Sequence, residues 1–172
     1  MKENIILIGY MGVGKTEVGR ALAAALGMDY LDTDSMIESE EKRSISDIFS
    51  NDGEEYFRNL ETGILKKLSG TKGHVVATGG GMVLREENVK MLKAMGPLVL
   101  LKSSPEIIEK RLVRSKNRPL INVKDRGARI RQMLDKRNPI YDNVADFSVD
   151  TSELSVSDAV KTILGFYKGE SK

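Results

Sequence analysis

The sequence has no cysteine and only one histidine in 172 residues. A chain without cysteine forms no disulfide and no cysteine-ligated metal centre, and it is compatible with a reducing compartment. With His74 as the sole histidine, one chain cannot assemble a metal site from several histidines. Disulfide scaffolds, cysteine-bound metals and multi-histidine metal centres are therefore excluded.

A strong charge of one sign and a long apolar run are also missing. Lysine and arginine total 27 against 25 aspartate and glutamate residues, and the formal net charge of +2 is too balanced to indicate a nucleic acid or a membrane surface as partner. The N-terminal stretch MKENIILIGYMGVGK turns polar too soon for a signal-peptide core or a membrane span. We expect a cytoplasmic protein that binds neither nucleic acid nor membrane. A monomer is the default expectation, because no heptad pattern or sticky stretch favours self-association.

Short apolar runs alternate with helical patterns along the chain, and 40% hydrophobic residues over this length suit one domain with one core. Five predicted strands lie at residues 4–9, 28–32, 74–78, 97–102 and 145–150. The predicted helices lie at residues 15–26, 54–68, 85–95, 105–114, 126–137 and 155–167. This alternation favours an α/β fold, in which helices cover both faces of a parallel sheet.

Two segments do not fit a simple crossover between strands. Residues 33–61 form a long helical excursion between the second and third predicted strands. Residues 115–125, SKNRPLINVKD, form a polar irregular segment between two predicted helices. A long irregular segment inside a compact domain is usually functional or mobile. Loop decoration is the plainer alternative for each segment.

The segment GYMGVGKT, residues 9–16, matches the phosphate-binding pattern G-x-x-x-x-G-K-[ST] between a predicted strand and a predicted helix. Glycines allow a tight loop whose backbone N–H groups converge on phosphate oxygens. In this pattern Lys15 reaches the β- and γ-phosphates, and the Thr16 hydroxyl can bind Mg²⁺. We therefore predict a nucleoside triphosphate site here rather than a glycine-rich structural turn.

The segment LDTD, residues 31–34, ends the second predicted strand. Its two aspartates are two residues apart, so they share one face of an extended segment. Ligands of open α/β sheets bind at the carboxyl ends of the strands. Asp32 is therefore a candidate Mg²⁺ ligand, and Asp34 is a candidate partner for a substrate hydroxyl. Helix capping is the alternative, which we consider weaker beside a phosphate loop.

The third predicted strand ends in VVATGGG, residues 75–81, where many P-loop proteins carry a metal-binding aspartate. Because no aspartate stands here, the assignment of Asp32 to Mg²⁺ is strengthened. Three consecutive glycines leave the backbone bare, so a small substrate or the γ-phosphate can rest against its N–H groups. A tight strand-to-helix turn, the alternative, would need only one glycine.

Three arginines complete the set of candidate residues. Arg58 and Arg137 could grip a carboxylate through bidentate hydrogen bonds. Arg118, in the irregular segment, suits a lid that closes on the transferring phosphoryl group. Spacing alone does not single out these three among the chain's basic residues.

Taken in order, GYMGVGKT, LDTD, GEEYFRNLE, ATGGG, NRPLI, KRNPIY and VDTS resemble the motifs of the shikimate kinases, and the resemblance runs from about residue 4 to residue 165. It implies a P-loop three-layer sandwich of the nucleoside-monophosphate-kinase type, with a five-stranded parallel sheet in the order 2-3-1-4-5. It implies transfer of the ATP γ-phosphate, with Mg²⁺, to the 3-hydroxyl of shikimate in the chorismate route to aromatic amino acids. The chain would be a single kinase domain, 1–172, with a substrate-binding region at about 33–61 and a lid at about 113–125.

The resemblance also implies roles for single residues, position by position. Shikimate would contact Asp34, Arg58, Gly79, Gly80, Gly81 and Arg137. The nucleotide would contact Gly12, Val13, Gly14, Lys15, Thr16, Glu17 and Arg114, with VDTSELS (149–155) on the other side of the adenine. Mg²⁺ would be held by Thr16 and Asp32. Catalysis would depend on Lys15, Asp34 and Arg118.

Several alternatives stay open at this point. Arg111 could replace Arg114 beside the adenine, and Asp34 could act as a base or only orient the hydroxyl. A kinase for another small acceptor, such as gluconate, would keep the phosphate loop and the lid, but the FRxxE, TGGG and RxPxY set argues against it. A nucleoside-monophosphate kinase would need a base-recognition pocket. A non-catalytic nucleotide-binding regulator would have no need of Arg118.

Overall fold

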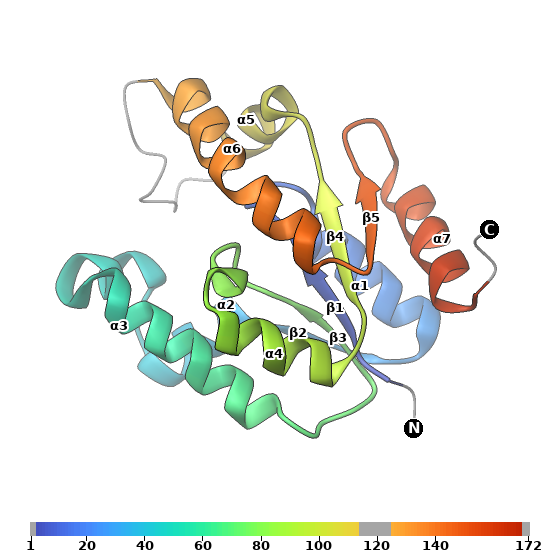
Figure 1. The fold of residues 1–172 in the computed structure, drawn as a ribbon, viewed down its shortest axis with the longest axis horizontal. Helices are drawn as coiled ribbons and strands as arrows, with labels where there is room; N and C mark the ends of the chain where they lie inside the picture. The colour runs from blue at the N-terminus through green and yellow to red at the C-terminus, as the bar shows by residue number, and fades with distance from the viewer. Residues whose placement is uncertain (1–2, 114–124, 170–172) are drawn as a thin grey trace.

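A five-stranded parallel sheet forms the centre of the molecule (Figure 1). A computed structural model of the chain describes residues 3–113 and 125–169. The strands are β1 (Ile5–Ile8), β2 (Asp29–Asp32), β3 (His74–Ala77), β4 (Leu98–Lys102) and β5 (Phe147–Asp150). Their order, β2-β3-β1-β4-β5, confirms the predicted order.

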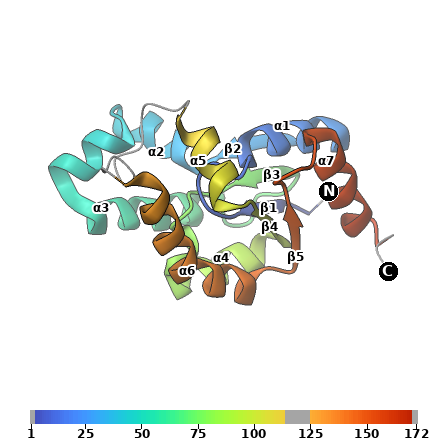
Figure 2. The ribbon, with the colours of Figure 1, turned by 90° about the horizontal axis from the view of Figure 1, so that it is seen from above.

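Helices cover both faces of the sheet (Figure 2). Helices α1 (Lys15–Leu26) and α7 (Val156–Tyr167) lie on one face, and α4 (Glu86–Met95) and α6 (Arg126–Val144) lie on the other. The sheet is therefore the middle layer of a three-layer α/β sandwich, which confirms the predicted fold class. In the described part of the chain, no helix is long and apolar enough to cross a membrane.

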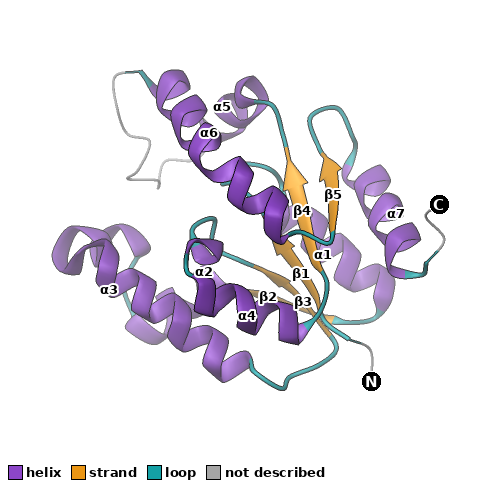
Figure 3. Ribbon diagram, viewed as in Figure 1, coloured by secondary structure: helices purple, strands orange, loops and turns teal. Residues whose placement is uncertain are grey.

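The central strand β1 is buried on both faces, and this explains its continuous apolar sequence IILI. Ile6 is in register with Val76 of β3 on one side and with Leu98 of β4 on the other. The five strands are short, and most of the described chain is helical (Figure 3). The buried sheet supports the site from below. The candidate site residues lie in the loops and helices that come after the strands.

The predicted helical excursion consists of α2 (Thr33–Glu41) and α3 (Ile45–Leu68), which lie beside the β2 edge of the sheet (Figure 1). Helix α3 begins earlier than the predicted residue 54, because Ser44 and Asp47 form a reciprocal capping box at its start. Gly53, with φ 83°, breaks the helical backbone within it. The second half of α3 is the predicted helix.

Helix α6 corrects the predicted end at residue 137, because it continues through Pro139 to Val144. A proline inside a helix removes one hydrogen bond and costs about 3 kcal/mol. The helix nevertheless continues, since its inward face stays buried beyond the proline at Tyr141 and Val144. Because the helix continues, Arg137 and Tyr141 lie one turn apart on the same buried face of α6.

Helix α5 (Pro105–Val113) leads towards the predicted lid, and a short 3₁₀ turn, η1 (Met82–Leu84), follows the three glycines. The predicted helix at 105–114 is confirmed as far as Val113. Arg114 and Arg118, which were assigned to the adenine and to the lid, lie outside the described residues.

Candidate active site

A cleft of about 1030 Å³ opens at the carboxyl ends of the strands. We call one part of it the nucleotide end, formed by Gly12–Thr16, Arg111 and Thr151. We call the other part the acceptor end, formed by Asp34, Arg58, Glu61, Gly79–Gly81 and Arg137. All of these residues line the cleft, so the described site residues predicted from the sequence are brought together in one place.

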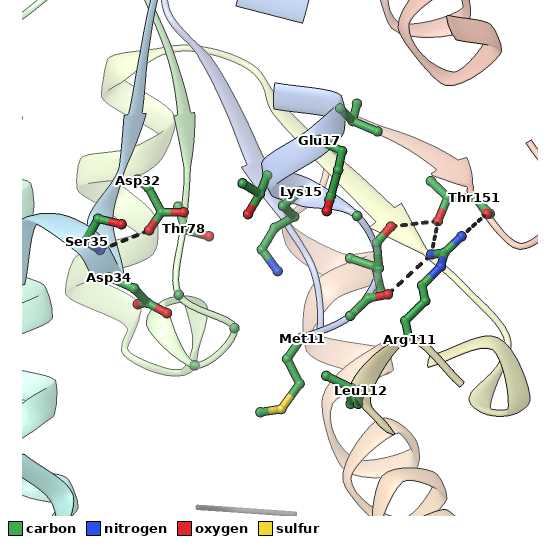
Figure 4. Close-up of a pocket in the computed structure, with 18 of the residues that line it drawn as sticks. Met11, Lys15, Glu17, Asp32, Asp34, Ser35, Thr78, Arg111, Leu112 and Thr151 are labelled. Atoms are coloured by element: carbon green, nitrogen blue, oxygen red, sulfur yellow. Dashed lines mark hydrogen bonds between the residues drawn. The ribbon is translucent and has the colours of Figure 1, made fainter. Parts of the chain in front are cut away.

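The phosphate loop joins β1 to α1 and uses backbone geometry that favours glycine. Gly12 and Gly14 have φ values of 78° and 98°, and Gly14 is the N-cap of α1. The Lys15 ammonium donates hydrogen bonds to the carbonyl oxygens of Gly9 (2.7 Å) and Tyr10 (2.8 Å). Its side chain points into the space between the loop and Asp34 (Figure 4). A cation beside loop N–H groups at a helix N-terminus is an arrangement that binds phosphate.

Two residues outside the motif hold this loop in place (Figure 4). The Arg111 guanidinium donates to the carbonyl oxygens of Thr151 (2.8 Å) and Gly12 (3.2 Å). The Thr151 hydroxyl lies 2.7 Å from the Val13 carbonyl oxygen and 2.9 Å from that of Lys102. Helix α5 and the segment after β5 therefore both support the nucleotide end. The sequence predicted the segment 149–155 here, but not the bonds of Thr151.

Asp32 caps α2, which is the role that the sequence offered as the alternative to binding Mg²⁺. Its Oδ1 accepts a hydrogen bond from the Ser35 amide at 3.1 Å and so caps α2, and its Oδ2 accepts one from the Tyr30 hydroxyl at 3.2 Å. Burial, followed by the negative charge of Asp32, raises the pKa of Tyr30 to about 12, so this hydroxyl stays a donor. A carboxylate oxygen has two lone pairs, so capping leaves Asp32 able to bind a cation.

Thr16 and Asp32 offer oxygen atoms, which are the ligands that Mg²⁺ prefers. Within residues 3–113 and 125–169, no three histidine, aspartate or glutamate side chains gather into a metal-binding group. Mg²⁺ at a nucleotide site needs only one or two protein oxygens, because phosphate and water complete its shell. The residues present therefore fit a nucleotide-linked Mg²⁺.

Two of the three glycines after β3, Gly79 and Gly81, make room for the protein's own charged side chains. A Cβ atom on Gly79 would lie 2.6 Å from Asp34 Oδ1 and 2.8 Å from Glu61 Oε1. A Cβ on Gly81 would overlap the Arg58 guanidinium. The expectation from the sequence was approach by a substrate or by the γ-phosphate. The structure adds that Asp34, Glu61 and Arg58 already fill the space that side chains at Gly79 and Gly81 would need.

Arg58 is buried and paired with two carboxylates of its own helix. Its guanidinium donates to Glu61 at 2.7 Å and to Glu54 at 2.9 Å. Burial lowers the pKa of Arg58, but the two carboxylates outweigh burial and leave the pKa raised, so the group stays charged. The spacings from Arg58 are four residues back and three forward, which place these glutamates on its helix face. That spacing is the signal that could have identified both glutamates from the sequence.

Glu61 is fully buried, and among the described residues its Oε1 has no hydrogen-bond partner. Burial raises the pKa of Glu61 to about 7, against the opposing effect of Arg58, and the negative charge of Asp34 raises it further. Glu61 is therefore partly protonated near neutral pH, although it forms an ion pair with Arg58.

Arg137 reaches the acceptor end from α6 and is also buried. Its guanidinium carbon lies 5.7 Å from the centroid of the Tyr10 ring, which is a cation–π distance. Two buried arginines and Asp34 thus line one end of the cleft. Such a set can bind a small molecule that carries a carboxylate and hydroxyl groups.

A phosphate loop at one end of a cleft and an anion-binding pocket at the other define a P-loop kinase for a small acceptor. The family model for shikimate kinase matches residues 11–168. Shikimate kinases from Caldanaerobacter subterraneus and Desulforudis audaxviator are 41% and 47% identical to the chain over 165 residues, which is 96% of the chain and 96% and 86% of the respective relatives. The chain belongs to the shikimate kinase family and is accordingly an ATP-dependent kinase.

Solved structures agree with this assignment. Shikimate kinase from Acinetobacter baumannii in complex with shikimate has a TM-score of 0.94 and 38% identity, and the match covers 99% of this chain and 96% of that one. A gluconokinase from Sinorhizobium meliloti has a TM-score of 0.61 at 16% identity, with 98% and 93% of the two chains covered. At that identity the second likeness shows the shared fold alone.

Proposed function

We propose that this enzyme transfers the γ-phosphoryl group of ATP to the 3-hydroxyl of shikimate in the route to chorismate. The observation that carries the choice of acceptor is the convergence of Arg58 and Arg137 beside Asp34 at one end of the cleft. Shikimate has one carboxylate and several ring hydroxyls. The two guanidinium groups would bind the carboxylate, and Asp34 would bind the hydroxyls.

Asp34 orients the attacking hydroxyl and can accept its proton as the new P–O bond forms. A loose phosphoryl-transfer transition state needs little deprotonation of the nucleophile, so orientation is the larger part of this role. Lys15 leaves its carbonyl partners on the loop and stabilises the negative charge of the transferring group. The Gly12–Thr16 backbone, together with Glu17 at the start of α1, positions the phosphates.

Thr16 and Asp32 would hold Mg²⁺ beside the phosphate loop. When bound, the ion neutralises the β- and γ-phosphate oxygens. Tyr30 donates to Asp32 and the Ser35 amide fixes its other oxygen, so the carboxylate is oriented before the nucleotide arrives.

Residues about 33–61 would form the substrate-binding region, and about 113–125 would form a lid that brings Arg118 to the phosphoryl group and excludes water. We further propose that Arg111, rather than Arg114, flanks the adenine. Its contacts with Gly12 and Thr151 support this assignment. The chain would act as a single domain and a monomer in the cytoplasm, without nucleic acid or membrane partners.

The test is ADP release from Mg·ATP in a coupled assay, with shikimate, gluconate or a panel of nucleoside monophosphates as acceptor. We expect strong stimulation by shikimate alone, and loss of that stimulation when EDTA removes the divalent ion. Stimulation by a different acceptor would overturn the roles of Arg58 and Arg137. ATP binding without turnover on any acceptor would instead favour a non-catalytic nucleotide-binding regulator.

A further inference from the structure

Glu61 is a fully buried carboxyl group at the acceptor end, and the proposed reaction does not use it. Its Oε2 accepts a hydrogen bond from the Arg58 guanidinium at 2.7 Å. Among the described residues, its buried Oε1 has no hydrogen-bond partner. An ionised carboxylate accepts hydrogen bonds at both oxygens, and a buried oxygen that accepts none is costly. One oxygen of Glu61 is therefore suited to a negative charge, and the other is suited to carrying a proton.

The oxygen without a partner lies close to the Asp34 carboxylate. A Cβ atom on Gly79 would lie 2.8 Å from Glu61 Oε1 and 2.6 Å from Asp34 Oδ1, so both oxygens lie against the same point of the backbone. The negative charge of Asp34 accordingly raises the pKa of Glu61. A proton on Oε1 would remove the repulsion between these two neighbouring carboxylates.

The charges of the acceptor end balance while Glu61 is ionised. Two positive and two negative side chains line this end of the cleft: Arg58 and Arg137, and Asp34 and Glu61. Residues 78–82, which pass beside them, include no titratable side chain. Glu54 also pairs with Arg58, but its side chain is 60% exposed, so water and salt screen its charge. An acceptor carboxylate would therefore add one negative charge to a balanced, buried set.

We propose that Glu61 takes up a proton from solvent when an acceptor carboxylate binds at this end of the cleft. The acceptor would compete with Glu61 for the Arg58 guanidinium and bring a second negative charge close to a buried one. Protonation restores the balance of charge, and a neutral carboxyl group keeps an oxygen that accepts from Arg58. The inference rests on the proposed function for the identity of the acceptor.

The free enzyme is in a suitable state to respond near neutral pH. Burial raises the pKa of Glu61 to about 7, so a large share of the molecules carries an ionised Glu61 slightly above that pH. Since the acceptor carboxylate raises this pKa further, protons enter as the acceptor binds. By linkage, binding of the acceptor then becomes weaker as pH rises above about 7.

The test is calorimetric titration of the enzyme with shikimate at about pH 7.5 in PIPES and in Tris, two buffers that differ strongly in their enthalpy of ionisation. The difference between the two binding enthalpies measures the protons exchanged. We expect uptake of roughly half a proton per shikimate, and a Kd that rises about tenfold between pH 6 and pH 8.5. Glu61→Gln, which keeps an oxygen for Arg58, should show neither effect.

Two controls separate the residue from the ligand. Glu55→Gln changes a glutamate of the same helix that pairs with Arg85 outside the cleft, and this variant should keep the proton uptake. Shikimate methyl ester brings no charge and should bind to the unmodified enzyme without proton uptake.

Shikimate binding without proton uptake, or with proton release, would overturn the proposal. Uptake that persists in Glu61→Gln or with the ester would also overturn it. If Glu61→Gln does not fold, infrared difference spectra of the unmodified enzyme decide: shikimate should produce a protonated-carboxyl band that shifts when glutamate is labelled with ¹³C. Absence of this band would contradict the proposal. Failure of shikimate to bind or to be phosphorylated would instead refute the proposed function, and this inference with it.

Discussion

At the nucleotide end, the groups that face the cleft come mainly from one short stretch, Gly12–Thr16, whereas at the acceptor end they come from α2, α3, the segment after β3, and α6. The nucleotide end offers neutral backbone donors around a single lysine. The acceptor end offers charged side chains that are buried and depend on one another, such as Arg58 with Glu61.

This difference has an energetic consequence. Backbone N–H groups at a helix start need no counter-charge, so the phosphate-binding groups of the loop do not depend on buried ion pairs. Buried charges are costly unless each has a partner, and removing one partner leaves the other unsatisfied. The acceptor end should therefore be the specific and fragile part of the cleft, and the nucleotide end the generic and robust part.

The largest expected effect belongs to neither end but to the lid. Arg118→Ala should lower kcat at least about 10³-fold while barely changing the Kd for shikimate, because the arginine would act on the transferring phosphoryl group alone. Steady-state kinetics and calorimetry would measure the two quantities. Arg129→Ala, at an exposed position on α6, is the control and should have no effect. Equal loss of turnover and of shikimate binding would argue against a lid.

At the acceptor end, Arg58→Ala should raise the KM for shikimate about 10- to 100-fold and leave the KM for ATP within about twofold. The reason is the loss of a guanidinium partner for the acceptor carboxylate. Arg85→Ala is the matched control, since Arg85 also pairs with a glutamate of α3, Glu55, but lies outside the cleft. An unchanged KM for shikimate in Arg58→Ala would show that Arg58 does not bind the acceptor.

At the nucleotide end, Thr151→Val should raise the KM for ATP several-fold without altering the Kd for shikimate. Valine keeps the shape but removes the hydroxyl that bonds to the Val13 carbonyl of the loop, which leaves a buried acceptor without this partner. Thr162→Val, on the exposed side of α7, controls for the substitution itself. If shikimate binding weakened as much as ATP binding, the two ends would not be independent.

The smallest effect concerns stability. Burial raises the pKa of Glu61 to about 7, above its ordinary value, so the stability that this group contributes is fully present below about pH 4.5 and is lost as pH rises through about 7. In Glu61→Gln, the part of the Tm decrease between pH 5.5 and pH 8 that comes from Glu61 should disappear, a change of a few °C. Thermal melts across this range would measure it. Superimposable pH profiles for the two proteins would contradict a raised pKa.

The sequence was informative where chemistry is local. GYMGVGKT predicted the phosphate loop because its glycines, Lys15 and Thr16 are contiguous. The strand order was available through the resemblance to a family, and the structure confirms it. The alternation of short apolar runs with helical patterns was sufficient to predict the layers, since the central strand β1 is buried on both faces.

What could not be predicted depends on contacts between distant segments. The predicted end of α6 at residue 137 was wrong, because the packing of Tyr141 and Val144 outweighs the local effect of Pro139. The need for glycine at position 79 could not be predicted, because it depends on how closely the Asp34 and Glu61 side chains approach that position. The pKa of Glu61 depends on burial. No local pattern carries that information.

The most direct measurement compares shikimate with its methyl ester as acceptor for the unmodified enzyme. The ester keeps every hydroxyl and removes the charge that Arg58 and Arg137 would bind. We predict that the KM for the ester is at least about tenfold higher, at a similar KM for ATP, and that Arg137→Ala narrows this difference. Equal use of the ester and of shikimate would contradict a carboxylate site at the acceptor end.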